Sequence, residues 1–363
     1  MSKETDQSRR VFLERAALAA AVTPLRRWER LLSPPASLRQ PPTAEGPLDA
    51  LRRANGWVNS RPLTASDLRG KVVLVQFWTF TCINWLRTLP YTRAWAEKYR
   101  DAGLVVIGAH TPEFPFEHDA ANVQRLTADL NVPYPVAIDS DYAIWNAFKN
   151  QYWPAIYLLD GAGRVVHQQF GEGGYDDTER MIQKTLEGAG ARKLEHQLVS
   201  VAGKGLEAAA DWNNARSPET YVGYQRTEGF ASPGDAVPER SHVYELPSAL
   251  RLNQWALTGD WTVASGAITA NRSAARVVFR FHSRDLHLVM GPPAGRAPVN
   301  FRVSIDGAPP GMSHGGDVDA DGMGVAKDQR VHQLLRQTGA IEDRTFQIEF
   351  REPGAQVFSF TFG

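Results

Sequence analysis

The hydrophobic periodicity of the chain changes once, across residues 191–216, and this change limits the folds that the chain can adopt. From residue 47 to 190, short apolar runs such as KVVLVQF (71–77) alternate with amphipathic stretches of helical spacing. From residue 217 to 363, apolar and polar residues alternate within short segments separated by turns, as in VVFRFH (277–282). The first pattern predicts an α/β domain covered on both faces of its sheet, the second an all-β sandwich of jelly-roll type, and residues 191–216 a connector.

The residues before this folded region divide into two segments. Residues 31–46 are rich in Pro, Ser and Ala and are predicted to be a linker. Residues 1–30 contain SRRVFL (8–13) and then a charge-free stretch (16–25), the order found in a twin-arginine export signal. Two arginines follow at once and no small-x-small cleavage site comes after them, so a disordered or helical basic leader that stays on the protein is the alternative. The signal predicts a periplasmic or cell-envelope protein, and the alternative predicts a cytoplasmic one.

The composition excludes several classes of partner. Forty basic and forty acidic residues cancel, so no net charge favours binding to nucleic acid or to an anionic membrane surface. No uncharged apolar run approaches the roughly 18 residues of a membrane-spanning helix. The chain has one cysteine, which makes an internal disulfide impossible. No cofactor is expected.

That cysteine, Cys82, follows the predicted strand 71–77 after a short loop and stands where a stretch of helical spacing (82–100) begins. The start of a helix offers free N–H groups and the positive end of the helix dipole, which lower the pKa of a thiol and favour the nucleophilic thiolate. Pro90 lies inside the same stretch and predicts a kink. A small buried hydrophobe is the other common role of a lone cysteine, but the order of strand, loop, cysteine and helix favours a reactive site.

The segment GKVVLVQFWTFTCINWLRTLP (70–90) resembles the thioredoxin-like domain of extracytoplasmic thiol–disulfide proteins, near the soluble C-terminal region of DipZ-type proteins, which have FWTYSCINC at this place. The resemblance extends through HTPEF (110–114) and residues 138–160 to FGEGGYDDTE (170–179). It implies a thioredoxin-like fold for residues 47–190.

The same resemblance implies that Trp153 and Pro154 form a cis-proline loop facing Cys82, where backbone groups can pair with an extended substrate. Trp85 departs from the family pattern, because it stands where the second cysteine of a dithiol enzyme would resolve a mixed disulfide. Three functions therefore stay open. Cys82 acts as a monothiol that a thiol/disulfide partner protein or a low-molecular-weight thiol resolves, or it is a one-cysteine peroxidase, or the chain is a non-catalytic binding or adaptor protein.

Four neighbouring residues are candidates for supporting Cys82. Thr79 completes part of a peroxiredoxin T-x-x-C pattern, although Val75 replaces the expected proline. Trp78 is expected either to shield the thiol or to pack. Arg87 would favour the thiolate if it folds back, and is otherwise a solvated helix charge. Glu113 is a candidate proton acceptor or an exposed loop carboxylate.

The C-terminal region, including SPETYVGY (217–224) and NQWALTGDWTV (253–263), resembles the last module of DipZ-type proteins, a carbohydrate-binding-like β-sandwich. Sugar sites use exposed aromatic faces flanked by polar groups. Tyr224, Trp255 and Trp261 are therefore candidate glycan contacts, with core packing as the alternative.

A metal site is suggested at one place only. Asp317, Asp319, Asp321 and Asp328, with a glycine after the third, have a spacing close to that of a calcium loop. The last ligand is Asp rather than Glu and strands are expected on both sides. A solvated acidic hairpin is the alternative, and no metal is firmly predicted.

Overall fold

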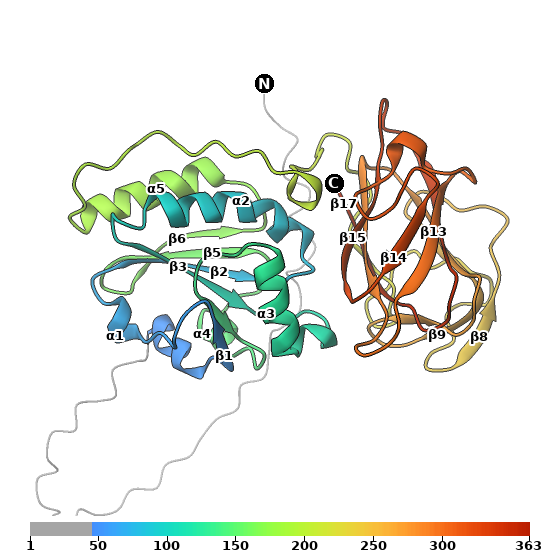
Figure 1. Cartoon of the computed structure of the whole chain (residues 1–363), viewed down its shortest axis with the longest axis horizontal. Helices are drawn as coiled ribbons and strands as arrows, with labels where there is room; N and C mark the ends of the chain where they lie inside the picture. The colour runs from blue at the N-terminus through green and yellow to red at the C-terminus, as the bar shows by residue number, and fades with distance from the viewer. Residues whose placement is uncertain (1–45) are drawn as a thin grey trace, which may run out of the picture. The chain divides into compact units, whose positions relative to one another are not determined.

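The computed structural model describes residues 46–363, which include two β-sheets. The first has six strands in the order β1-β4-β3-β2-β5-β6 (Figure 1). The central strands β2, β3 and β4 are parallel, and the outer three run antiparallel to their neighbours. The strand bounds are β1 Gly56–Val58, β2 Val72–Trp78, β3 Leu104–His110, β4 Val136–Ile138, β5 Ala155–Leu159 and β6 Val165–Phe170.

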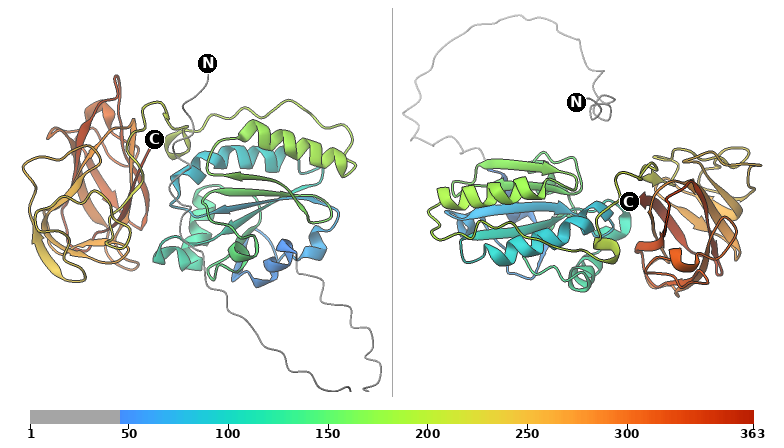
Figure 2. Two further views of the ribbon diagram at one scale, coloured as in Figure 1. Left: turned by 180° about the vertical axis from the view of Figure 1, so that it is seen from behind. Right: turned by 90° about the horizontal axis from the view of Figure 1, so that it is seen from above.

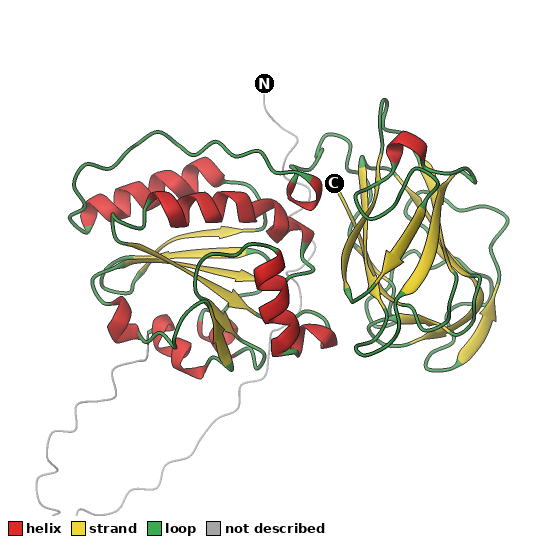
Figure 3. Ribbon diagram, in the orientation of Figure 1, coloured by secondary structure: helices red, strands yellow, loops and turns green. Residues whose placement is uncertain are grey.

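Helices cover both faces of this sheet, as Figures 1 and 3 show. One face packs against α2, α3 and α5, and the other against η1, α1 and α4. Strand β2 is buried along its whole length, because both of its faces carry apolar side chains into these two cores. The predicted α/β fold is confirmed. The helix bounds are η1 Pro47–Arg53, α1 Ala65–Leu68, α2 Ile83–Lys98, η2 Pro115–His118, α3 Ala120–Asp129, α4 Ala143–Ala147 and α5 Tyr175–Gly188.

The C-terminal strands form an eleven-stranded antiparallel sheet, whose main path is β14-β13-β16-β11-β9-β10-β17-β12-β15. Strand β9 (Trp255–Val263) pairs with β11 through its first half and with β10 and β8 through its second half. Gly259 lies between the halves with φ of 85°, and a β-carbon there would lie 3.2 Å from the Ala275 α-carbon. Glycine thus permits the bend that curls the sheet around one core.

The predicted all-β fold is confirmed, with its two layers continuous through β9. Figure 2 shows the curled sheet from two further sides. The remaining bounds are η3 Gly205–Glu207, β7 Thr220–Tyr221, β8 Ser241–Tyr244, β10 Ile268–Ala270, β11 Ala275–Phe281, β12 Asp285–Gly291, β13 Val299–Ile305, η4 Gly311–Ser313, β14 Met323–Ala326, β15 Arg330–Arg336, β16 Arg344–Phe350 and β17 Gln356–Phe362.

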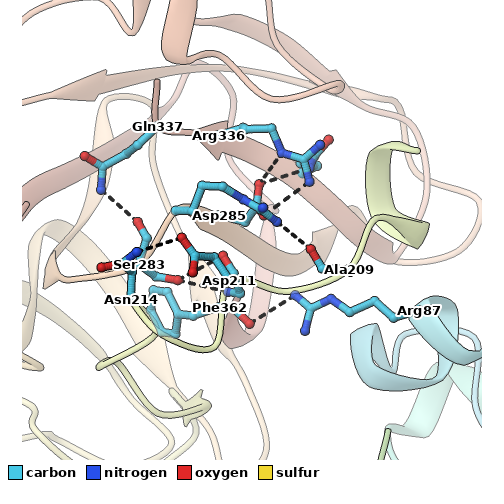
Figure 4. A network of polar contacts seen from close by, with 12 residues as sticks. Arg87, Ala209, Asp211, Asn214, Ser283, Asp285, Arg336, Gln337 and Phe362 are labelled. Carbon is cyan, nitrogen blue, oxygen red and sulfur yellow. Dashed lines mark hydrogen bonds and ion pairs between the residues drawn. The ribbon is translucent and has the colours of Figure 1, made fainter. Parts of the chain in front are cut away.

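The C-terminal sheet contacts α2 and the loop after β3. Phe358 of β17 packs against Phe114 and Phe116, with ring centroids 5.3 and 4.9 Å apart. Residues 191–216 contact the C-terminal region, since the Ala209 carbonyl accepts a hydrogen bond of 2.6 Å from Arg284 (Figure 4). Within residues 46–363, no helix is long and apolar enough to cross a membrane. The predicted export signal and almost all of the linker lie outside the described residues.

Candidate functional site

Cys82 is the N-cap residue of α2, so its side chain lies where the helix begins. Its amide donates to the Thr79 carbonyl at 3.2 Å, which closes the turn after β2. Its carbonyl accepts from the Leu86 amide at 3.1 Å, which starts the helix. The backbone amides of Trp85 and Asn84 lower the pKa of the thiol, as expected for a helix start.

The pKa of Cys82 nevertheless moves opposite to the direction expected from the sequence. Burial has the largest effect and raises the pKa well above its ordinary value, and the negative charges of Glu219 and Glu113 raise it further. The residue as a whole is only partly buried because it borders a cavity, but protein surrounds the thiol on its other sides. The expectation of a depressed pKa is wrong, and at neutral pH the resting side chain is a thiol.

The cavity beside Cys82 has a volume of about 790 Å³ and is built from segments far apart in the sequence. The first turn of α2, the loop after β3 and the loop before β5 supply one part of its wall. Residues 212–226 and the end of β17 supply the other. The residues that define its chemistry are Cys82, Glu113, Trp153, Arg216, Glu219 and Tyr221.

Glu113 is held in this wall by two residues of the C-terminal region. The Tyr221 hydroxyl donates to its Oε1 at 2.5 Å, and Arg226 forms an ion pair with the same oxygen at 3.1 Å. The Arg226 guanidinium also lies 3.4 Å from the centroid of the Tyr221 ring. Burial raises the pKa of Tyr221, so its hydroxyl stays protonated and donates. Glu113 therefore faces the cavity of Cys82 as a hydrogen-bonded and ion-paired carboxyl group, and it is not an exposed loop residue.

Glu219 is the second carboxyl group beside Cys82. Enclosure by the cavity wall raises its pKa to about 7, and the neighbouring charge of Glu113 adds to the effect. Water still reaches Glu219 through the cavity, since the residue is exposed. The nearby Tyr221 hydroxyl and Arg226 act in the opposite direction and lower the pKa of this carboxyl. A carboxyl group with such a pKa exchanges protons close to neutral pH, which suits a proton acceptor for a thiol.

Trp85 is fully buried beneath this site rather than facing the cavity. Its indole stacks on that of Trp78, which is also fully buried, and its Nε1 donates to the Gln76 side chain at 3.2 Å. Of the two roles considered for Trp78, packing is therefore the one that the structure shows.

Glu117 connects the two loops that flank Cys82. Its buried carboxyl accepts hydrogen bonds from the Thr81 hydroxyl at 2.6 Å and from the Glu113 and Phe114 amides at 2.7 and 2.9 Å. Burial raises the pKa of Glu117 to about 7. The hydroxyl of Thr79, the residue of the partial peroxiredoxin pattern, forms a hydrogen bond of 3.4 Å with His110 Nε2. In residues 46–363 its hydroxyl has no hydrogen bond to Cys82.

The Trp153–Pro154 peptide bond is cis, as the resemblance implied. The Trp153 side chain borders the cavity. Its Nε1 donates to the Thr111 carbonyl at 3.0 Å, and its ring lies 4.2 Å from that of Trp145. These contacts hold the loop before β5 against the loop after β3.

Two family models match the chain. Residues 55–184 match the redoxin family, and residues 217–363 match a family described as the thioredoxin like C-terminal domain. Residues 55–184 have a thioredoxin-like α/β fold. It is 34% identical to the protein DipZ of Mycobacterium tuberculosis over 316 residues, which are 86% of this chain and 42% of that protein. The chain thus spans less than half of the DipZ sequence.

Shorter relatives match the first sheet and its helices. The thiol-disulfide oxidoreductase YkuV of Bacillus subtilis is 28% identical over 39% of this chain and 94% of its own length. A solution structure of a thioredoxin-like protein in the oxidized form is 30% identical, covers 37% of this chain and 90% of its own, and has a TM-score of 0.34. The redoxin match supports the thioredoxin-like α/β fold of residues 55–184, and the chain is similar to a thiol-disulfide oxidoreductase.

Arg87 is neither a solvated charge nor a partner of Cys82. Its side chain is 2% exposed and forms an ion pair with Glu172 at 3.3 Å. It also donates to the Phe362 carbonyl at 3.2 Å (Figure 4). The spacing of the helix places Arg87 away from its exposed face, where the C-terminal region covers it.

The predicted glycan contacts are only partly at the surface. Trp255 is 1% and Trp261 0% exposed, because the alternation of β9 turns both rings toward the core of the curled sheet. Each Nε1 is satisfied by a backbone carbonyl, of Glu228 and Thr258 respectively. The prediction is wrong for these two residues, and Tyr224, at 39% exposed, is the one candidate that presents a ring to solvent.

The predicted calcium loop is not formed. Asp317 pairs with Arg330 and accepts from the Gln333 amide at 2.7 Å, and Asp328 pairs with Arg125 at 2.6 Å. Asp319 accepts from the Met323 amide at 2.8 Å in a tight turn, and Asp321 is exposed. Across the part of the chain that the structure describes, no group of three or more His, Cys, Asp or Glu side chains is arranged to hold a metal ion.

Sequence reasoning missed the part of the site that comes from the C-terminal region, namely Arg216, Glu219, Tyr221 and Arg226. These residues lie in and next to SPETYVGY, a segment that the resemblance had marked without a role. No periodic or motif signal links them to Cys82, because only the packing of the two sheets brings them together.

Proposed function

We propose that this protein carries out thiol–disulfide exchange with Cys82 as its single sulfur nucleophile. The observation that supports the proposal most is the placement of Cys82 at the start of α2, on a cavity next to the loop with the cis peptide Trp153–Pro154. The relatives add support, since YkuV is a thiol-disulfide oxidoreductase. No second cysteine exists in the chain, so an external thiol must complete each turnover.

The exchange needs a proton acceptor, because burial keeps Cys82 protonated at rest. The carboxylate of Glu219 takes the proton from the thiol, and the Cys82 sulfur attacks one sulfur of a bound disulfide. A new disulfide forms between Cys82 and that sulfur while the old S–S bond breaks, and the leaving thiolate takes up a proton. An external thiol then attacks the mixed disulfide and restores the Cys82 thiol.

Intact-mass spectrometry of the full chain, incubated with a small disulfide near neutral pH, tests this function. We expect one adduct per chain, which disappears when a thiol is added. The Cys82→Ser variant is the control and should remain unmodified. A wild-type chain that forms no adduct under conditions in which its unfolded form reacts would exclude the proposal.

A non-catalytic binding protein is the second candidate, and the raised pKa of Cys82 favours it. This function predicts no adduct with any disulfide but binding at the same cavity. The peroxidase alternative has less support, because among the described residues the Thr79 hydroxyl bonds His110 and not the thiol. Rapid formation of sulfenic acid with hydrogen peroxide would restore it.

Export by the twin-arginine route is part of the proposal and is supported by SRRVFL (8–13) alone. Replacement of Arg9 and Arg10 by lysine should keep the protein in the cytoplasm, as measured by cell fractionation. An unchanged distribution would exclude this route. Division into domains at residues 47–190 and 217–363 is likewise proposed, and the two family matches at 55–184 and 217–363 support it.

A further inference from the structure

Two oppositely charged residues on the cavity wall have no charged partner. Arg216 and Glu219 lie three positions apart at the start of the C-terminal region, and both border the cavity of Cys82. Among the described residues, neither forms an ion pair, whereas the neighbouring Glu113 is paired with Arg226. The cavity therefore offers one cationic and one anionic group to whatever fills it.

A third polar group lies on the same wall. Thr361 of β17 borders the cavity and is 4% exposed, and its hydroxyl has no hydrogen-bond partner among the described residues. A buried hydroxyl without a partner costs free energy unless a bound molecule satisfies it. Aromatic side chains of Tyr152, Trp153 and Trp212 complete the wall. A cavity of about 790 Å³ with aromatic side chains and several convergent polar groups is large enough to hold a small molecule.

We propose that this cavity binds a small disulfide that carries both an ammonium and a carboxylate group, that is, an α-amino-acid disulfide of the cystine type. Glu219 binds the ammonium group, Arg216 binds the carboxylate, and Thr361 bonds a polar group of the ligand. The inference names the substrate class of the exchange proposed above, and its covalent part rests on that function. Its binding part does not, because the recognising groups are separate from the sulfur.

The covalent step is balanced without any further oxidant. The Cys82 thiol loses its proton to solvent in the cavity, and its sulfur forms an S–S bond with one half of the amino-acid disulfide. The other half leaves as a thiolate, which is the reduced product. Cys82 is oxidised by the same two electrons that reduce the leaving sulfur.

Binding is tested first, without any covalent chemistry. The full chain with Cys82→Ser is titrated calorimetrically with S-methylcysteine, which has both charged groups, and with analogues that lack the carboxylate or the amine. We expect each truncated analogue to bind about tenfold more weakly or worse, because one charged hydrogen bond is lost. Equal affinity for all three probes would overturn the proposal.

Matched variants locate the two charged contacts. In the same Cys82→Ser background, Glu219→Gln should weaken S-methylcysteine about tenfold but leave the analogue without the amine unchanged. Arg216→Gln should show the converse pattern. Glu245→Gln and Arg240→Gln, exposed residues outside the cavity wall, are the controls and should bind like the parent. Equal losses in variants and controls would contradict the assignment.

The covalent step is measured by intact mass with cystine, with cystamine, which has no carboxylate, and with dithiodipropionate, which has no amine. Cystine should react fastest. Glu219→Gln should slow cystine yet accelerate neutral iodoacetamide, since loss of the negative charge lowers the pKa of Cys82. Binding of S-methylcysteine without any adduct from cystine would exclude the exchange function and retain the binding site. Adducts that form equally fast with all three disulfides, or only with a disulfide in a protein loop, would exclude the substrate class and retain the exchange function.

Discussion

The indole ring of Trp85 stacks on that of Trp78, with ring centroids 4.1 Å apart and planes inclined by 21°. Both rings are fully buried between α2 and the first sheet. The residue that takes the place of a second cysteine is therefore part of the hydrophobic core, and it does not cover or contact the cavity of Cys82.

Restoring a second cysteine at this position should damage the fold. Trp85→Cys removes most of a buried aromatic side chain, so we expect the free energy of unfolding to fall by about 3–5 kcal/mol. Urea denaturation of the reduced protein measures the loss. Trp85→Phe keeps an aromatic ring and should lose distinctly less. A Trp85→Cys protein as stable as the wild type would show that this part of the core repacks without cost.

The alkylation of Cys82 should depend on pH in a way that reflects its raised pKa. Iodoacetamide reacts with the thiolate, and burial together with Glu219 and Glu113 shifts the pKa above the ordinary 9.0. The rate should therefore be low at pH 7 and should still rise above pH 9. Labelling is followed by mass spectrometry, with Cys82→Ser as the control. A rate that reaches its plateau below pH 8 would contradict the raised pKa.

Glu117 should contribute to stability through its hydrogen bonds and through its titration. In Glu117→Gln, the side-chain NH₂ would face one of the N–H or O–H donors that the carboxyl now accepts from, so we expect a loss of about 2 kcal/mol. The folded-state pKa of Glu117, about 7, lies above the ordinary 4.5. The raised pKa of Glu117 therefore adds to the free energy of unfolding in full below pH 4.5, and this addition is lost as the pH rises through 7.

Urea denaturation at several pH values separates these two effects. Glu117→Gln should be less stable than the wild type at pH 5 and should show a shallower decline of stability between pH 4.5 and 7. Glu97→Gln, at an exposed position of α2, should follow the wild-type curve. An identical pH dependence in wild type and Glu117→Gln would contradict the raised pKa.

The ion pair between Arg87 and Glu172 should be costly to break from one side. Glu172 is 10% exposed, so Arg87→Met leaves its carboxylate without a cation in a largely buried site, and we expect a loss of about 3 kcal/mol. The double variant Arg87→Met/Glu172→Gln should recover part of that loss. Thermal unfolding of the wild type, the two single variants and the double variant gives the coupling free energy between Arg87 and Glu172. Strictly additive effects of the two substitutions would show that the pair does not interact.

The sequence predicted most of what is local to the first sheet. The apolar run of β2, Cys82 at the start of α2 and the cis Trp153–Pro154 peptide all lie where strand patterns and the family resemblance place them. Each of these features is determined by a short segment, which either has a clear strand or helix pattern or resembles a known family.

Features that depend on packing between distant segments could not be predicted. The direction of the Cys82 pKa is set by burial and by Glu219, which belongs to another part of the chain. Arg87 carries a charge and would be expected at the surface, but it is buried because the end of β17 covers it. The sequence alone is compatible with Trp255 and Trp261 either at the surface or in the core. They lie in the core because the sheet curls around them.

The hydrogen bond from Arg87 to the Phe362 carbonyl has one more consequence. It fastens the end of β17 to the helix whose first turn bears Cys82, with Thr361 one residue before the bonded carbonyl. We therefore expect the C-terminal region to limit the size of the molecules that reach the sulfur. We expect molecules that fit the cavity to reach Cys82 directly. A bulky folded partner would first have to break the Arg87–Phe362 hydrogen bond, and separating α2 from β17 costs free energy.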